Sequence, residues 1–451
     1  MNNTELSQHG LLRSLRQWET LALSFGAMIG WSWVVLIAPL MQRSGSAGAL
    51  IATAVAGTVI ILIGAIYAEL CAAMPEVGGE HAYSLRAMGR NASFVCTWAI
   101  VFAYVSVVAF EAVALPTVMT HLFPFLGNGA LWQVGDSDVF LDQALIGSVT
   151  SLVLMWINIR GVHFSATLQA IVVLVILLAG FSLFAGLAAS GTPANMTPLY
   201  NNGLKGVLAA MALVPFMLVG FDVIPQAAEE IDLAPRKIGI LLVASIAIAV
   251  VWYLLIELAV GMLLTLEQRS TVELATVSAA EAAWGRTGAT LLLVGGVAGI
   301  LTSWNGFLVG GSRALFALGN HHMVPAWFGQ LHRTRHTPVN ALLFIGILGA
   351  LAPLLGRQAL IWFVDGGGFG LMIAYILVCA SFIMLRRNEP AMTRPFMLPG
   401  GMATGLFGLL ASIVMATLYL PGMPAALVWP QEWLLVLGWF LLGIALFRSS
   451  S

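Results

Sequence analysis

The sequence predicts an all-α integral membrane protein with twelve transmembrane helices. Of its 451 residues, 60% are hydrophobic and only 9% are charged, whereas a soluble domain carries about 25% charged residues. So few charges cannot cover a water-soluble fold of this size. Two of the expected spans are interrupted by glycine and proline, which is typical of transporters built from repeats. The 19 basic and 20 acidic residues nearly balance, so we expect no basic surface for nucleic acid.

The spans follow from the apolar runs, since a transmembrane helix needs about 20 mostly apolar residues. Twelve segments satisfy this, with approximate bounds 21–41, 47–74, 94–123, 141–159, 166–189, 204–230, 238–264, 287–318, 339–355, 360–385, 403–420 and 433–447. If the N-terminus is cytoplasmic, only five of the 19 basic residues lie outside: Arg43, Lys205, Arg269, Arg286 and Arg357. This asymmetry fits the positive-inside rule. We therefore expect a multi-pass protein of the cytoplasmic (inner) membrane, with both termini in the cytoplasm.

The first and sixth spans contain residues that interrupt helices. The first has Gly26 and Gly30 near its middle, and the sixth contains, in order, Pro215, Gly220, Asp222 and Pro225. Close helix packing and simple kinks are the alternative explanation. Paired interruptions in corresponding positions of two halves instead point to the central site of a transporter. Unwound backbone cannot stay unsatisfied in lipid, and it can bind an anion at N–H groups or a cation at carbonyl oxygens.

Four stretches of the chain resemble the amino acid–polyamine–organocation superfamily of permeases. Residues 26–30 (GAMIG) are similar to its first-helix motif, and residues 68–83 (AELCAAMPEVGGEHAY) to the end of its second helix. Residues 220–230 (GFDVIPQAAEE) resemble its broken sixth helix, and residues 385–395 resemble the segment after its tenth. The resemblance therefore extends over nearly the whole chain.

The resemblance implies a domain organisation and a function. Helices 1–5 (residues 19–190) and 6–10 (200–386) would form a 5+5 inverted repeat in which helices 1 and 6 are broken. A cytoplasmic N-terminus (1–18) would precede them, and two extra helices (400–448) would follow. The implied function is secondary active transport of an amino acid or related small amine by alternating access, without enzymatic activity. We expect the protein to be surrounded by membrane lipid and to bind a small-molecule substrate. We expect it to be a monomer or a homodimer.

The substrate site of the family can be carried over residue by residue. The resemblance implies that the substrate carboxylate meets the backbone N–H groups of Gly30, Trp31 and Ser32. The substrate amine would meet the carbonyl oxygens of Met28 and Val219. The other implied site residues are Phe216 as an aromatic gate, Gly220 and Asp222 at the break of helix six, and Phe307 on helix eight.

One departure from the family pattern leaves the substrate open. Trp31 stands where the family commonly has a small residue, and its bulk crowds a carboxylate-binding loop. An amine or amino alcohol without an α-carboxylate, similar to ethanolamine or a polyamine, is therefore an alternative substrate. A non-transporting sensor or a channel on the same fold is a further alternative.

Acidic residues inside spans are costly and therefore candidates for function. Glu111 lies in the middle of the third span and is expected to contact the substrate or carry a proton, unless it is a neutral structural residue. Asp222 is expected to act in gating or coupling. The roles of Glu257 and Asp365 stay open, although Asp365 precedes three glycines that would permit a hinge. Glu69, near a membrane face, is expected to tie the second helix to basic residues of an inner loop.

The sequence predicts no cofactor and no metal centre, only a possible coupling ion, Na⁺ or H⁺. Some proton-coupled relatives carry a lysine on helix five, but the corresponding residue here is Ile176. The hydroxyls of Thr302 and Ser303, with the carbonyls of Gly26 and Ile29, offer the oxygen ligands that a hard cation prefers. The alternative is that these hydroxyls only bond to their own helix.

Overall fold

The computed structural model describes residues 11, 13, 15–123, 125–135, 137–161, 166–272 and 274–450. Within this part, nine helices are long and apolar enough to cross a membrane, or ten if one bent N-terminal pair counts as a span. Two shorter apolar helices lie at Val339–Leu355 and Gly401–Thr417. The chain is therefore a multi-pass helical membrane protein. Of the expected N-terminal segment 1–18, residues 1–10, 12 and 14 lie outside the described part.

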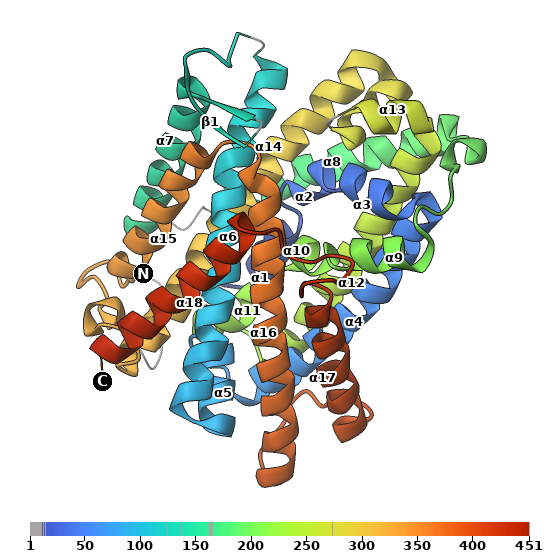
Figure 1. The fold of residues 1–451 in the computed structure, drawn as a ribbon. Helices are drawn as coiled ribbons and strands as arrows, with labels where there is room; N and C mark the ends of the chain where they lie inside the picture. The colour runs from blue at the N-terminus through green and yellow to red at the C-terminus, as the bar shows by residue number, and fades with distance from the viewer. Residues whose placement is uncertain are drawn as a thin grey trace.

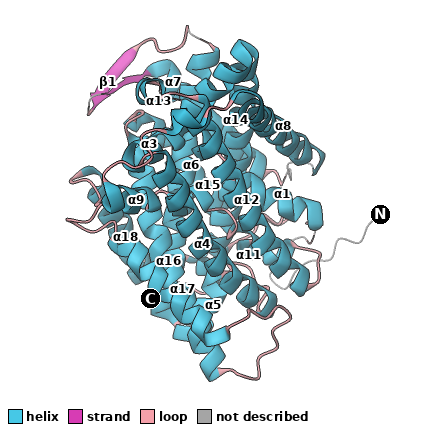
Figure 2. Ribbon diagram, turned by 90° about the vertical axis from the view of Figure 1, so that its right-hand side faces the viewer, coloured by secondary structure: helices cyan, strands magenta, loops and turns pink. Residues whose placement is uncertain are grey.

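The elements of the first half are α1 (Gln17–Met28), α2 (Ser32–Val35), α3 (Ile37–Ser44), α4 (Ser46–Ala73), α5 (Glu80–Met88), α6 (Arg90–Leu122), β1 (Ala130–Val134), β2 (Ser137–Phe140), α7 (Leu141–Ile159), α8 (Ala166–Ser190) and η1 (Pro193–Met196). Those of the second half are α9 (Gly203–Met211), α10 (Val214–Leu218), α11 (Val223–Gln226), η2 (Ala228–Glu230), α12 (Pro235–Leu263), α13 (Leu266–Thr271), α14 (Ala275–Asn320), η3 (Ala326–Gly329), α15 (Val339–Leu351), η4 (Ala352–Leu355), α16 (Ala359–Asn388), α17 (Gly401–Thr417) and α18 (Gln431–Ser449). The hairpin β1–β2 and α13 lie at one end of the bundle, and α5 lies at the other (Figures 1 and 2).

The two predicted helix interruptions are present. The first span leaves helical geometry at Ile29 (φ −101°, ψ 59°), and the chain bends by 60° between Gln17–Val35 and Ile37–Ser44. The sixth is broken after α10, where Val219 is extended (φ −62°, ψ 143°) and Gly220 has a φ of +129°. Glycine adopts that positive φ without the steric cost that a side chain would bring.

Helix α6 runs through the interior of the bundle. It packs against α14 on one side and α16 on another, and Figure 1 shows it beside α16. In the apolar stretch of α6, 100% of the residues are buried inside the protein, whereas in that of α8 only 28% are buried. Helix α8 instead exposes Leu174, Leu178 and Phe181 along one stripe, at 54%, 54% and 60%. A side chain in the middle of α6 therefore faces protein, whereas the α8 stripe is suited to lipid.

Two features differ from the sequence-based expectation. The antiparallel hairpin β1–β2, in which Gln133 pairs with Asp138, was not expected in an all-α protein. Helix α14 begins at Ala275, before the expected start at residue 287, and has a non-helical kink at Gly285 (φ 62°, ψ −156°). Hydropathy selects segments that suit lipid, so it missed both a polar loop hairpin and the helical segment ahead of the apolar run.

Candidate functional site

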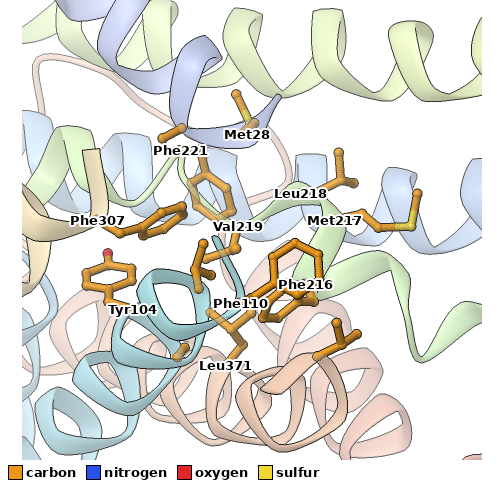
Figure 3. Packing of buried hydrophobic residues seen from close by; sticks show 14 of the residues in the cluster. Met28, Tyr104, Phe110, Phe216, Met217, Leu218, Val219, Phe221, Phe307 and Leu371 are labelled. Atoms are coloured by element: carbon orange, nitrogen blue, oxygen red, sulfur yellow. The ribbon is translucent and has the colours of Figure 1, made fainter. Parts of the chain in front are cut away.

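The two helix interruptions meet at Gly220. A Cβ atom on Gly220 would lie 2.8 Å from the backbone carbonyl carbon of Ala27 and 2.8 Å from the backbone nitrogen of Met28. Real Cβ atoms essentially never come so close to other heavy atoms, so this crossing requires glycine. The close approach brings the predicted carbonyl positions, Met28 and Val219, into one region (Figure 3).

Glu111 reaches into the first interruption from α6. Its Oε1 accepts the backbone N–H of Trp31 at 3.3 Å, and its side chain interacts with that of Ser303. A Cβ on Gly30 would collide with this carboxylate and would lie 2.6 Å from Ser303 Oγ. Glu111 is 1% exposed, and its Oε2 has no hydrogen-bond partner among the described residues. The loop predicted to bind a substrate carboxylate thus already contacts a carboxylate of the protein.

Tyr253 of α12 spans the same interruption, although the sequence offered no reason to select it. Its hydroxyl lies 2.5 Å from Ser32 Oγ and donates to the carbonyl oxygen of Met28 at 3.0 Å. Two of the predicted site groups, one on each side of the break, therefore share one tyrosine. The signal available was a phenol in a largely apolar helix, which is too weak to identify a partner.

Phe216 lies within an aromatic layer next to the second interruption. Its ring meets that of Phe110 edge-on, with centroids 5.4 Å apart, and both rings are visible together in Figure 3. A Cβ on Gly367 of α16 would lie 3.1 Å from the Phe216 ring. Phe307 does not join this pair but packs on Tyr104, with centroids 5.3 Å apart. Phe216 thus lies between α6 and the glycines of α16, where movement of either helix changes its packing.

Asp222 is fully buried at the second interruption. Its Oδ1 accepts the backbone N–H of Gly220 at 3.1 Å, which satisfies a donor freed by the break. Its Oδ2 accepts a hydrogen bond of 3.4 Å from the hydroxyl of Tyr375 on α16. Asp222 therefore connects the unwound segment to a neighbouring helix.

Two of the oxygens expected around a coupling ion, those of Thr302 and Gly26, lie together. The hydroxyl of Thr302 donates to the carbonyl oxygen of Gly26 at 3.2 Å. The same hydroxyl lies 3.2 Å from the carbonyl oxygen of Ala298 and 3.0 Å from that of Gly299, both in its own helix. A Cβ on Gly299 would lie 2.8 Å from the carbonyl oxygen of Ile29. Hydroxyl and carbonyl oxygens are the ligands that a hard cation prefers. Thr302 also bonds to carbonyl oxygens of its own helix, as the alternative explanation expects.

Three other acidic residues lie away from the interruptions. Glu257 accepts a hydrogen bond from Thr53 at 2.5 Å, between α12 and α4. Asp365 lies 3.9 Å from Arg43, and both line a cavity of about 460 Å³. Both oxygens of Glu69 are paired. Oε1 contacts Arg386 Nε at 2.9 Å and Arg394 Nε at 3.2 Å, and Oε2 accepts from Arg386 Nη2 at 2.5 Å. Glu69 thus ties α4 to the last turn of α16 and to the segment after it, where the sequence predicts basic partners for it.

Comparison with known proteins gives the family. The sequence model of the family described as "Amino acid permease" matches residues 15–443. The chain is similar to the branched-chain amino acid permease BcaP of Bacillus subtilis (strain 168), with 24% identity over 405 residues, 87% of this chain and 85% of that protein. It is also 24% identical to the methylthioribose transporter of the same organism, over 86% of this chain and 84% of that protein.

A plant protein extends the range of relatives. The vacuolar cationic amino acid transporter 4 of Arabidopsis thaliana is 24% identical over 85% of this chain and 64% of its own length. The family match covers both interrupted helices and nearly all of the described bundle. The chain therefore belongs to the amino acid permease family and is a membrane transporter rather than an enzyme.

Proposed function

We propose that this permease moves an amino acid or a related small amine across the cytoplasmic membrane by alternating access. The observation that carries the proposal is the contact of two unwound segments at Met28 and Gly220, deep inside a helical bundle. Such segments present N–H groups and carbonyl oxygens that a zwitterion can satisfy. Two of the relatives are named for amino acids and one for methylthioribose, which supports a small polar substrate.

In this proposal the substrate lies between the interruptions. Its carboxylate would meet N–H groups of Gly30, Trp31 and Ser32, and its ammonium group would meet the carbonyl oxygens of Met28 and Val219. Phe216 would close over it, because an aromatic ring wedged between α6 and α16 can leave only when these helices shift. Phe307 would form one wall of the site. Asp222 would act as a gate at the break of the sixth helix.

A second candidate, an amine without an α-carboxylate, is favoured by the contact between Glu111 and Trp31. The N–H of Trp31 is already used by Glu111 Oε1, so a substrate carboxylate would have to displace a buried acidic group. An ammonium group would instead pair with Glu111 Oε2, which has no partner among the described residues. Pairing offsets the cost of burying both charges.

We further propose that this permease has twelve transmembrane helices. The nine long helices, the bent pair and the two shorter apolar helices of the described part would supply twelve spans, with helices 1–5 and 6–10 as inverted repeats. Either Na⁺, held by oxygens of Gly26, Ile29, Thr302 and Ser303, or H⁺ would drive uptake.

The topology can be tested with single introduced cysteines. The native cysteines Cys71, Cys96 and Cys379 are free and buried, so a label on an introduced cysteine reports one position. A cysteine at Ser450 or at Ser7, which lies outside the described residues, should be protected from an impermeant reagent in intact cells. Labelling at one terminus but not the other would mean an odd number of spans.

The substrate test is uptake by purified protein in liposomes. Each amino acid is compared with its own decarboxylated amine, for example serine with ethanolamine, under separately imposed sodium and proton gradients. Saturable counterflow of an amino acid is the expected result, whereas counterflow of amines alone would select the second candidate. Flux that neither saturates nor shows counterflow would indicate a channel, and binding without flux would indicate a sensor.

A further inference from the structure

A second buried carboxyl, Glu80, lies beside Asp222. Glu80 is the first residue of α5 and is 0% exposed. Its Oε2 accepts a hydrogen bond from the side-chain amide of Gln226, whose backbone N–H donates to the carbonyl oxygen of Asp222 at 3.3 Å. Gly79 makes this approach possible, because a Cβ there would lie 2.7 Å from Pro225 Cβ. The turn before α5 and the end of the sixth segment thus bring two carboxyl groups together.

Among the described residues, the titratable groups recorded around Glu80 include no lysine or arginine. The titratable groups that face it within the described part are Asp222 from the unwound segment, Tyr67 and Cys71 from α4, Tyr83 from α5, Cys96 and Tyr104 from α6, and Tyr375 from α16. The adjacent His81 is neutral at pH 7, because burial and the neighbouring His321 lower its pKa to about 3. Ionising both carboxyls would cost several kcal/mol for each uncompensated charge. A proton held by either carboxyl would avoid part of that cost.

Several buried polar side chains lie near the pair. Within the described residues, the atoms without a partner include Oε1 of Glu80, Oε1 of Gln226 and the hydroxyls of Tyr67, Tyr83 and Tyr104. Buried polar atoms without partners are rare in folded proteins. Together with Oε1 of Glu80 itself, the four atoms near the pair supply both donors and acceptors along which a proton can move.

The residue that follows Glu80 in the chain borders a cavity. Its chain neighbour His81 contributes Nε2, which lies 2.9 Å from Nδ1 of His321. The two histidines line a cavity of about 220 Å³ together with Arg86, and His321 is exposed. The residue after Glu80 thus lines this cavity, and α5, to which both residues belong, lies at one end of the molecule (Figure 2).

We propose that Glu80 and Asp222 form a two-carboxyl proton-binding site that couples transport to a proton gradient. The site rests on the proposed transport function and assigns its coupling ion. A proton from solvent adds to a carboxylate oxygen to give a carboxylic acid, and it returns to water when the acid ionises. Asp222 belongs to the unwound segment and Glu80 to α5. A movement between these elements changes the repulsion between the carboxyls and therefore the number of protons bound.

The closing experiment measures protonation directly and does not require a known substrate. Infrared difference spectra of the protein in lipid nanodiscs are recorded as a function of pH for wild type, Glu80→Gln and Glu257→Gln. Glu257 is the matched control, because it is also 0% exposed and has one bonded and one unpartnered oxygen. It lies on α12, away from the pair.

The expected results distinguish a coupled pair from two independent acids. Wild type should show two linked titration steps of protonated carboxyl groups. Glu80→Gln should remove one step and move the Asp222 step to lower pH, whereas Glu257→Gln should remove one step and move no other. If Glu80→Gln does not fold, Asp222→Asn provides the reciprocal shift in the Glu80 step. Absence of any shift in the partner's step would overturn the proposal.

A transport measurement tests coupling separately. With a substrate found in the liposome panel, Glu80→Gln should lower proton-driven accumulation to equal concentrations inside and outside, while Glu257→Gln accumulates as wild type does. Proton-driven accumulation by Glu80→Gln would refute the coupling role. If no compound is transported, the infrared titration still tests the proton site, so failure of the transport proposal is separable from failure of this one.

Discussion

Replacing Glu111 by glutamine separates the two substrate classes. Glutamine has the size of glutamate and keeps an oxygen that can accept the Trp31 N–H, now at 3.3 Å from Oε1. The change therefore removes the charge and turns the unpartnered Oε2 into an amide that cannot accept from an ammonium group. A hydrogen bond to a charged group contributes about 1.5–3 kcal/mol. The affinity for an amine paired with Glu111 should thus fall by roughly 10- to 150-fold.

The assay is inhibition of counterflow in liposomes by serine and by ethanolamine, for wild type and Glu111→Gln. If Glu111 pairs an amine, ethanolamine should lose affinity by this factor while any proton dependence is unchanged. If Glu111 carries the coupling proton, exchange should survive and uphill uptake in a proton gradient should vanish. Wild-type affinity together with wild-type uphill uptake would refute both, and Glu111 would then be a structural residue.

Three further changes test other parts of the site and its support. Phe216→Ala removes the ring that packs on Phe110 and should slow transport of protein that remains folded by circular dichroism; an unchanged rate would contradict the gate. Thr302→Ala should abolish sodium dependence if Na⁺ binds there, and sodium-independent wild-type uptake would end that hypothesis. Glu69→Gln leaves Arg386, whose side chain is only 16% exposed, without its partner and should destabilise the fold by about 3 kcal/mol. The same change at Glu389, which pairs with Arg86 on the surface, should have little effect on the detergent melting temperature, so equal losses would contradict the role of burial.

Much of the fold can be predicted from the sequence because membrane insertion depends on local properties. The runs of apolar residues specify the spans, and the predicted bounds 141–159 coincide with α7. Glycine and proline specify where a helix is interrupted, so the breaks near Gly30 and Gly220 were predictable. The paired oxygens of Glu69 were also predictable, because a carboxyl near a membrane face needs a basic partner.

Partners across the bundle were not predictable in the same way. Tyr253 and Ser32 are 221 positions apart, and Gln226 and Glu80 are 146 positions apart. Whether such side chains meet depends on the rotation and tilt of each helix, and these are set by packing against all its neighbours. The sequence by itself determined that this chain is a membrane transporter with two interrupted helices. Only the tertiary structure decided that Glu111 enters the first interruption and Glu80 approaches the second, because a hydropathy pattern carries no information about which side chains lie opposite each other.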